Sequence, residues 1–225
     1  MEYNKQLVGS KHILHDAQEE YSFIHLLDEP VQSPYLILKR VFDVVFSLIL
    51  GVIALPIILI FAVLIKLETP GSVFYHQERV GLMGKTFNVT KLRSMYDGIE
   101  KKSGAMWAQK EDPRVTKIGH FIRKTRIDEL PQLWSVIKGD MSLIGPRPER
   151  PNFTEQFSDE VPGFEQRLLI KPGLSGWAQV HGGYEVTPAQ KLEGDLYYIH
   201  HFGFMTDLTI FIETIKTVIT GEGAR

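Results

Sequence analysis

An uninterrupted apolar run constrains this chain more than any other feature. Residues 44–65 include no charged side chain, and the nearest charges are Asp43 before the run and Lys66 after it. As a helix, a run of this length would extend roughly 33 Å, about the thickness of a bilayer's hydrocarbon core. It starts too far from Met1 for a signal peptide, and no small-residue cleavage site follows it. The run therefore predicts a helix in contact with a membrane.

Three arrangements of this helix are compatible with its length: a buried core helix, a spanning helix, and a re-entrant helix that bends and returns to the same face. A core helix is disfavoured because apolar residues go all the way round. Pro56 near the middle removes a backbone hydrogen bond and favours a bend. Lys39 and Arg40 precede the run and Lys66 follows it, as expected if both ends are cytoplasmic. These features favour the re-entrant helix, although prolines also occur in spanning helices.

Composition limits the remaining classes of function. The 225 residues suit one domain plus an anchor, and a net charge of −2 gives no overall attraction to nucleic acid or acidic lipid. The chain has no cysteine, which excludes disulfides, thiolate zinc sites and a cysteine nucleophile. This composition fits a reducing, cytoplasm-facing location.

The rest of the chain predicts an α+β fold. Residues 73–80 and 86–92 have strand character and are joined by a glycine-containing turn, which predicts a small antiparallel β-hairpin. Several amphipathic helices are expected at the membrane interface, over residues 116–139 with a break near Asp128, 152–169 with a break at Pro162, 187–201 and 207–220. Residues 1–38 are predicted to form a peripheral segment.

Two adjacent carboxylates, Asp128 and Glu129, follow a group of three cations at residues 123–126. The ordinary explanation is a helix start that Asp128 caps. The functional one is that an aspartate near arginines stays ionised and can attack phosphorus as a nucleophile. Glu129 can then help to hold a divalent cation or handle a proton. Magnesium suits such a site, since it takes one or two carboxylates plus substrate phosphates.

Three further clusters carry groups that suit phosphate or sugar recognition. Arg147 lies between two prolines, which would hold its guanidinium ready for a phosphate. Lys91 lies near the end of the predicted hairpin, and Trp177 follows a glycine-rich turn. Each has an ordinary alternative: a rigid surface turn, an exposed strand face and a core tryptophan.

The order of these motifs resembles the bacterial sugar transferase family, the monotopic polyprenol-phosphate phosphoglycosyl transferases. The resemblance covers roughly residues 36–225. The residues that carry it are Lys39, Arg40 and Asp43 before the proline-containing apolar run, and the stretches 91–95, 128–133, 139–142 leading into 145–148, and 171–179.

The resemblance implies a reaction. A UDP-sugar would give its sugar 1-phosphate to undecaprenyl (polyprenol) phosphate through a phosphosugar-aspartyl intermediate on Asp128, with release of UMP, at the first step of exopolysaccharide, capsule or other cell-surface glycan synthesis. The family's Asp-Glu dyad with Mg²⁺ corresponds to Asp128 and Glu129, with Asp128 as the metal ligand. Arg123, Arg147 and Lys91 would hold phosphates.

The resemblance also implies an organisation. Residues 39–68 would form the re-entrant helix and residues 69–225 a catalytic domain on the cytoplasmic face of the inner membrane. Larger members carry further N-terminal membrane helices and a further domain, which residues 1–38 are too short to hold, so the small form is expected. No nucleic-acid partner is expected, and an oligomer is left open.

One stretch departs from the family pattern. Many members carry Asn-Gly-Arg after a Trp-Ala-Gln motif, whereas here the sequence continues with His181, Gly182 and Gly183. Trp177, His181 and Gly183 mark the expected sugar or nucleotide region, and the missing arginine leaves the sugar open. The alternatives are an inactive membrane-attached scaffold of the same fold, against which the intact carboxylate pair argues, and a nucleic-acid binder using residues 114–126, against which the balancing acids argue.

Overall fold

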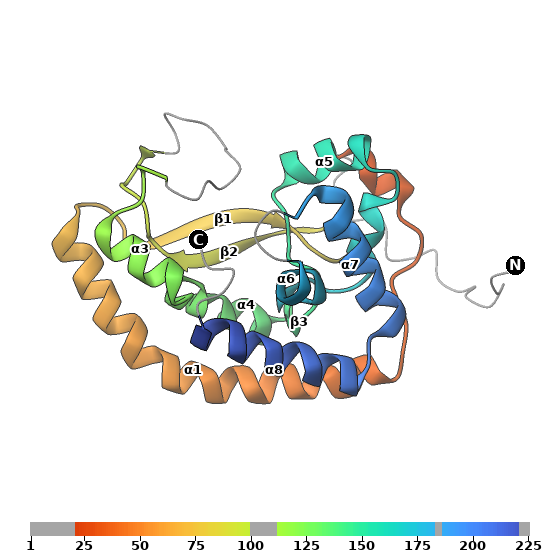
Figure 1. The fold of residues 1–225 in the computed structure, drawn as a ribbon, viewed down its shortest axis with the longest axis horizontal. Coiled ribbons are helices and arrows are strands. Elements are labelled where there is room, and N and C mark those ends of the chain that lie inside the picture. The colour runs from red at the N-terminus through yellow and green to blue at the C-terminus, as the bar shows by residue number, and fades with distance from the viewer. Residues whose placement is uncertain (1–20, 100–111, 183–185, 221–225) are drawn as a thin grey trace, which may run out of the picture.

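The computed structural model describes residues 21–99, 112–182 and 186–220, and it has the predicted α+β fold. The long helix α1 (Tyr35–Glu68) runs along one edge of the molecule, with α8 (Phe204–Thr220) beside it (Figure 1). The hairpin of β1 (Phe74–Val80) and β2 (Thr86–Leu92) lies above them in this view.

The remaining elements are short. The helices are α3 (Lys117–Lys124), α4 (Leu133–Lys138), α5 (Pro151–Glu160), α6 (Trp177–His181) and α7 (Pro188–His201). The 3-10 turns are η2 (Ser22–Leu26), η3 (Leu82–Gly84), η4 (Ile127–Gln132) and η5 (Phe164–Leu169), and the two other strands are β3 (Ser142–Ile144) and β4 (Gly173–Ser175). The helix breaks predicted near Asp128 and Pro162 are confirmed, because 3-10 turns or bends occupy both places.

The first half of α1 is fixed to the body by polar side chains. Lys39 Nζ lies 2.6 Å from a carboxylate oxygen of Asp207 on α8. Asp43 accepts a hydrogen bond of 3.0 Å from the backbone amide of Leu143, and both Lys39 and Asp43 are buried. A buried charge is tolerated only when it is paired or hydrogen-bonded, so these contacts fix the rotation of α1 about its axis.

The second half of α1 packs against the same body. Ile65 forms a buried cluster with Leu92 of β2 and Ile122 of α3. Glu68 is the last residue of α1, and its carboxylate accepts a hydrogen bond of 3.2 Å from the amide of Ile118. Both ends of the predicted membrane helix therefore contact one folded unit, which favours the re-entrant arrangement over the spanning one.

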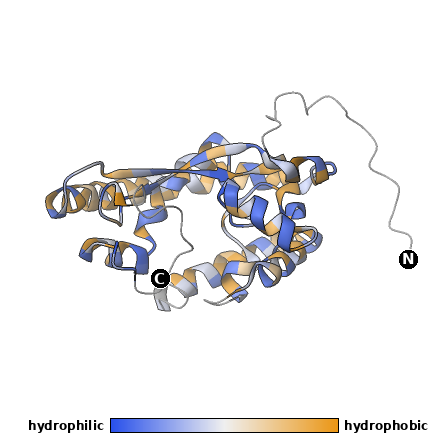
Figure 2. Ribbon diagram, turned by 90° about the horizontal axis from the view of Figure 1, so that it is seen from above, coloured by the Kyte–Doolittle hydropathy of each residue, from blue (hydrophilic) through white to orange (hydrophobic). Residues whose placement is uncertain are grey.

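The outward side of α1 is apolar and exposed. Among the described residues, α1 is the one helix long and apolar enough to cross a membrane, and 11% of its most apolar stretch is buried. Figure 2 colours most of α1 as hydrophobic. Its exposed side chains include Val41, Val45, Ile49, Val52, Ile53, Leu59, Ile60 and Val63. An apolar surface of this extent marks a site of membrane or protein contact.

Helix α8 extends this apolar surface. Phe204 and Phe211 of α8 pack against Phe42 and Phe46 of α1, with ring centroids 6.3 Å apart in both pairs. The exposed apolar residues of α8 are Phe204, Met205, Leu208, Ile212, Ile215 and Val218. This confirms α8 as an amphipathic helix, and its apolar residues suit the boundary between headgroups and acyl chains.

The hairpin presents one face to the body. Its strands are antiparallel, and Tyr75 is paired with Lys91. The turn contains two residues with left-handed backbone angles, Met83 (φ 54°) and Gly84 (φ 77°). Val89 packs against buried residues of the α4 region, so Lys91, two residues further on, points to the same side. The hairpin therefore aims Lys91 inward.

The structure contains a second small sheet that the sequence did not predict. β3 and β4 pair in parallel, and the amide of Gly145 donates to the Ser175 carbonyl at 2.8 Å. A Cβ on Gly145 would lie 2.5 Å from the Lys171 carbonyl oxygen, and one on Gly173 would lie 2.1 Å from the Gly145 nitrogen. These glycines allow the two backbones to approach, which fixes the start of the segment that carries Arg147.

The contacts of α1 predict that both of its ends lie on one side of the membrane. Because the chain has no cysteine, single cysteines can be introduced at Gln32→Cys and Ser72→Cys, both exposed. An impermeant maleimide applied to oriented vesicles should label both from the same side. Val52→Cys, on the exposed apolar side of the helix, should resist labelling until detergent is added. Labelling of the two ends from opposite sides would establish a spanning helix.

Candidate active site

The two adjacent carboxylates lie in the 3-10 turn η4, between α3 and α4. The chain enters this turn through Arg126, whose left-handed backbone (φ 55°) is uncommon for a residue other than glycine. Asp128 and Glu129 are both buried. Of the two interpretations of Asp128, the one in which it caps a helix is wrong, because Arg126 holds the N-cap position and no side chain caps the turn. The sharp turn instead directs the two carboxylates to different surroundings.

Glu129 is held by two cations. Lys91 Nζ donates to its Oε1 at 2.9 Å, and Arg147 donates to both of its oxygens, at 3.3 Å for Oε2. Burial alone would raise the pKa of Glu129, but the charges of Arg147 and Lys91 overcome this effect and hold the pKa well below its usual value. Glu129 is therefore ionised, and it gathers Lys91 and Arg147 at one point.

Asp128 has different surroundings. Within the described part of the chain, its carboxylate makes no hydrogen bond or ion pair. Burial raises the pKa of Asp128 to about 6, with Lys91 acting against the rise and Glu129 adding to it. This upward shift of the pKa differs from the sequence prediction, in which the charges of nearby arginines were expected to keep Asp128 ionised. Its carboxylate is still mostly ionised at neutral pH and is available to a ligand.

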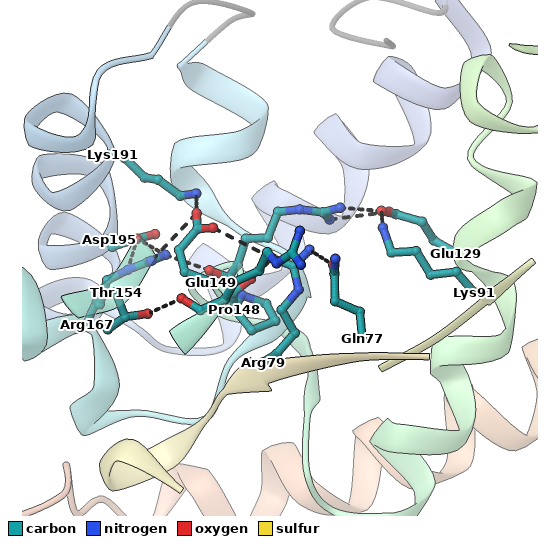
Figure 3. Close-up of polar contacts among 12 residues, drawn as sticks. Gln77, Arg79, Lys91, Glu129, Pro148, Glu149, Thr154, Arg167, Lys191 and Asp195 are labelled. Carbon is teal, nitrogen blue, oxygen red and sulfur yellow. Dashed lines mark hydrogen bonds and ion pairs between the residues drawn. The ribbon is translucent and has the colours of Figure 1, made fainter. Parts of the chain in front are cut away.

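A second group of charged side chains, which includes Arg79, Glu149 and Arg167 (Figure 3), holds the backbone of Arg147. Arg167 donates to the Arg147 carbonyl at 2.7 Å and pairs with Asp195 of α7 at 2.7 Å. Arg79 of β1 donates to the Pro148 carbonyl at 2.9 Å. Buried guanidinium groups therefore hold the Arg147 segment, in addition to the two flanking prolines.

Glu149 joins these cations into one network. Its carboxylate pairs with Lys191, lies 3.7 Å from Arg79 and lies 4.0 Å from Arg167. Burial alone would raise the pKa of Glu149, but the three cations overcome this effect and lower it to about 2. The network connects β1, η5 and α7 to the segment after β3.

The other predicted site residues differ in their relation to Asp128 and Glu129. The charge of Arg123 acts on Asp128, lowering its pKa, while Arg123 Nε donates to Ser94 Oγ at 2.8 Å. Trp177 stacks on His181, with ring centroids 3.9 Å apart, and packs at a tilt against Tyr197 of α7, with centroids 4.2 Å apart. Trp177 is partly buried against the core, and among the described residues these rings form no hydrogen bond with Asp128 or Glu129. Gly183 lies outside the described residues.

Sequence reasoning missed Arg79, Arg167 and Asp195. Arg79 could have been found, because strand alternation places it on the same face as Tyr75, the residue paired with Lys91. Arg167 and Asp195 are almost fully buried, and each pairs with a residue many positions away in the chain. No local pattern in the sequence indicates either residue.

The carboxylate oxygens of Asp128 and Glu129 are the candidate ligands for a magnesium ion. No group of three histidine, aspartate or glutamate side chains that could hold a metal occurs among the described residues. Magnesium does not need one, because it is usually bound by one or two carboxylates plus substrate phosphates. Glu129 is occupied by Lys91 and Arg147, so Asp128 is the carboxylate that fits the role of ligand.

Comparison with known proteins gives a consistent result. The model of the bacterial sugar transferase family matches residues 34–221. An Aeromonas hydrophila protein named UDP-N-acetylgalactosamine-undecaprenyl-phosphate N-acetylgalactosaminephosphotransferase is 47% identical over 93% of this chain and 49% of its own length. A Bacillus subtilis (strain 168) protein, a putative undecaprenyl-phosphate N-acetylgalactosaminyl 1-phosphate transferase by name, is 66% identical over 60% of this chain and 74% of its own.

A more distant relative is named for a different sugar. The Escherichia coli (strain K12) UDP-glucose:undecaprenyl-phosphate glucose-1-phosphate transferase is 36% identical over 90% of this chain and 45% of its own length. The chain thus spans about half the length of the Aeromonas and E. coli relatives.

The Glu149 network predicts a specific acid sensitivity. A pKa of about 2, against 4.5 for an ordinary glutamate, corresponds to about 3 kcal/mol of stability. This contribution is present above pH 4.5 and is lost as the pH falls from 4.5 toward 2. Glu149→Gln should therefore lower the melting temperature at pH 7 and flatten its fall at acid pH, measured by thermal unfolding in detergent.

The exposed Glu160 of α5 offers a matched control, and Glu160→Gln should melt like the parent protein at both pH values. An acid-dependent loss of stability that is as steep in Glu149→Gln as in the parent would exclude Glu149 as its source.

Proposed function

This chain belongs to the bacterial sugar transferase family, and we propose that it transfers a sugar 1-phosphate from a UDP-sugar to undecaprenyl phosphate. The observation that carries the proposal is the division between the two buried carboxylates. Glu129 is neutralised by Lys91 and Arg147, whereas Asp128 beside it has no partner among the described residues. The site thus offers one available carboxylate next to two cations that suit phosphates.

In the proposed first step, an Asp128 oxygen attacks the β-phosphorus of the donor. The bond from this phosphorus to the oxygen bridging the two phosphates breaks, UMP leaves with that oxygen, and the sugar phosphate is joined to Asp128. In the second step, a phosphate oxygen of the lipid attacks the same phosphorus and releases Asp128. The donor and the lipid therefore need not be bound together.

The cations have a defined task in both steps. Phosphoryl transfer depends on positioning and on neutralising the charge of the phosphate oxygens. Arg147 offers a planar two-pronged donor and Lys91 a compact charge, and Glu129 keeps both in place. Magnesium bound at Asp128 would supply further charge neutralisation for the diphosphate.

The membrane surface of the fold supports a lipid acceptor. The exposed apolar residues of α1 and α8 would enter the cytoplasmic leaflet of the inner membrane. Arg40 ties α1 to α4, directly after the turn that carries the carboxylates, by donating to the Ile137 carbonyl at 2.7 Å. The carboxylates would thus lie close to the depth of lipid phosphates.

The relatives suggest which sugar to test first. Two relatives, 47% and 66% identical over their matched stretches, are named for N-acetylgalactosamine, and the glucose-named relative described above is 36% identical. We infer that UDP-N-acetylgalactosamine is the first donor to test, ahead of UDP-glucose.

The proposal is tested by UMP release from purified protein given UDP-N-acetylgalactosamine, undecaprenyl phosphate and magnesium. Release should require the lipid for sustained turnover. Asp128→Asn should abolish release, because its amide cannot act as the nucleophile. Asp159→Asn, an exposed position on α5, should leave turnover unchanged. Full turnover in Asp128→Asn would exclude Asp128 as the nucleophile, and no turnover with any UDP-sugar would favour an inactive scaffold.

Arg147→Lys separates charge from geometry. It keeps a cation near Glu129 but removes the two-pronged donor, so kcat/KM for the donor should fall about 10- to 100-fold, the worth of one hydrogen bond to a charged group. Arg114→Lys is a matched control, because Arg114 donates to both carboxylate oxygens of Asp112. An equal loss in both variants would argue against a role for Arg147 in binding phosphate.

A further inference from the structure

A cavity of about 370 Å³ lies between β1 and the start of α5. A volume of this order is typical of sites for small molecules. Its walls carry aromatic rings, amides, a guanidinium and two carboxylates, and the lining residues include Tyr21, Tyr75, Gln77, Asn152, Arg150 and Glu155. None of these residues belongs to the carboxylate site described above.

One wall of the cavity is formed by β1 and adjoins Lys91, which is proposed to hold a phosphate. Tyr75 is the antiparallel partner of Lys91, and side chains of directly opposed residues lie on the same face, about 5 Å apart at their Cβ atoms. Gln77, two residues along β1, faces the same side. A ligand whose charged part contacts Lys91 can therefore extend along Tyr75 and Gln77.

The other wall is tied to the segment that carries Arg147. Arg150 follows Arg147 by three residues and begins α5 as its N-cap. Arg79 connects the two walls, because it donates to Gln77 Oε1 and to the Pro148 carbonyl. Gln77 Nε2 in turn donates to the Tyr75 hydroxyl at 3.1 Å. The cavity and Arg147 are therefore held in a fixed relation, as a preorganised site requires.

The chemistry of the walls favours a neutral, flat and polar ligand. Aromatic rings offer stacking surfaces, and the amides of Gln77 and Asn152 can each donate and accept hydrogen bonds, as the edge of a nucleobase requires. The Glu155 carboxylate on α5 suits ribose hydroxyls, and together with the Glu78 carboxylate on β1 it would repel an anion.

We propose that this cavity binds the nucleoside of the donor while Lys91 and Arg147 hold its diphosphate. The proposal rests on the proposed function and adds a location for the uridine. It places the base against the rings and amides of β1 and α5, with the diphosphate extending toward Asp128.

The test is calorimetric titration of UMP into the purified protein in detergent with magnesium. Asn152→Ala and Gln77→Ala should each weaken UMP binding about three- to tenfold, as expected for one lost hydrogen bond. Inorganic pyrophosphate, which lacks the nucleoside, should bind these variants as it binds the parent. Gln156→Ala, exposed one turn further along α5 and outside the cavity, should bind UMP normally.

Comparison with a second ligand isolates the contribution of the base to the binding affinity. Ribose 5-phosphate lacks uracil, so the parent should bind UMP more tightly, and the difference should shrink in Asn152→Ala. Equal affinity of the parent for the two ligands would overturn the proposal, as would unchanged UMP affinity in both cavity variants or an equal loss of pyrophosphate affinity. Lipid-dependent turnover in the same preparations would show that the transferase proposal stands even if the nucleoside site fails.

Discussion

The structure of the site depends on one buried carboxylate, Glu129, and on the two cations that neutralise it. Lys91 comes from the hairpin and Arg147 from the segment after β3, so this one group joins three separate parts of the chain. Removing one partner from a buried ion pair typically costs about 3–5 kcal/mol, because the remaining charge stays buried without compensation. The placement of Arg147 depends in turn on Arg167 and Arg79, which bind the backbone on either side of it.

The adjacent carboxylates show how surroundings assign roles to similar groups. Asp128 and Glu129 are neighbours in one short turn, yet the pKa of Asp128 rises to about 6 while that of Glu129 falls well below its usual value. The difference arises because the cations contact Glu129 directly and reach Asp128 only through longer-range charge. Pairs of titratable groups whose pKa values are pushed apart are typical of catalytic sites.

The apolar surface and the charged site meet along α1. Its exposed side is suited to lipid, while Lys39, Arg40 and Asp43 on its other side bind the body of the protein. The polar residues in the first turns of α1 thus fix the body of the protein to a helix whose remaining length is suited to lipid. This arrangement would bring a water-soluble donor and a lipid acceptor to the same group of side chains.

The sequence by itself determined the apolar helix, the hairpin and the identity of the carboxylate pair. Each depends on a local pattern: an uncharged run, strand-like stretches around a glycine-containing turn, and adjacent side chains of one chemical type. Only the tertiary structure decided that β3 pairs with β4, that Arg167 and Asp195 hold the Arg147 segment, and that Asp128 is left available. Those outcomes arise from contacts between residues far apart in the chain, where burial and charge pairing, rather than neighbouring residues, set the energy.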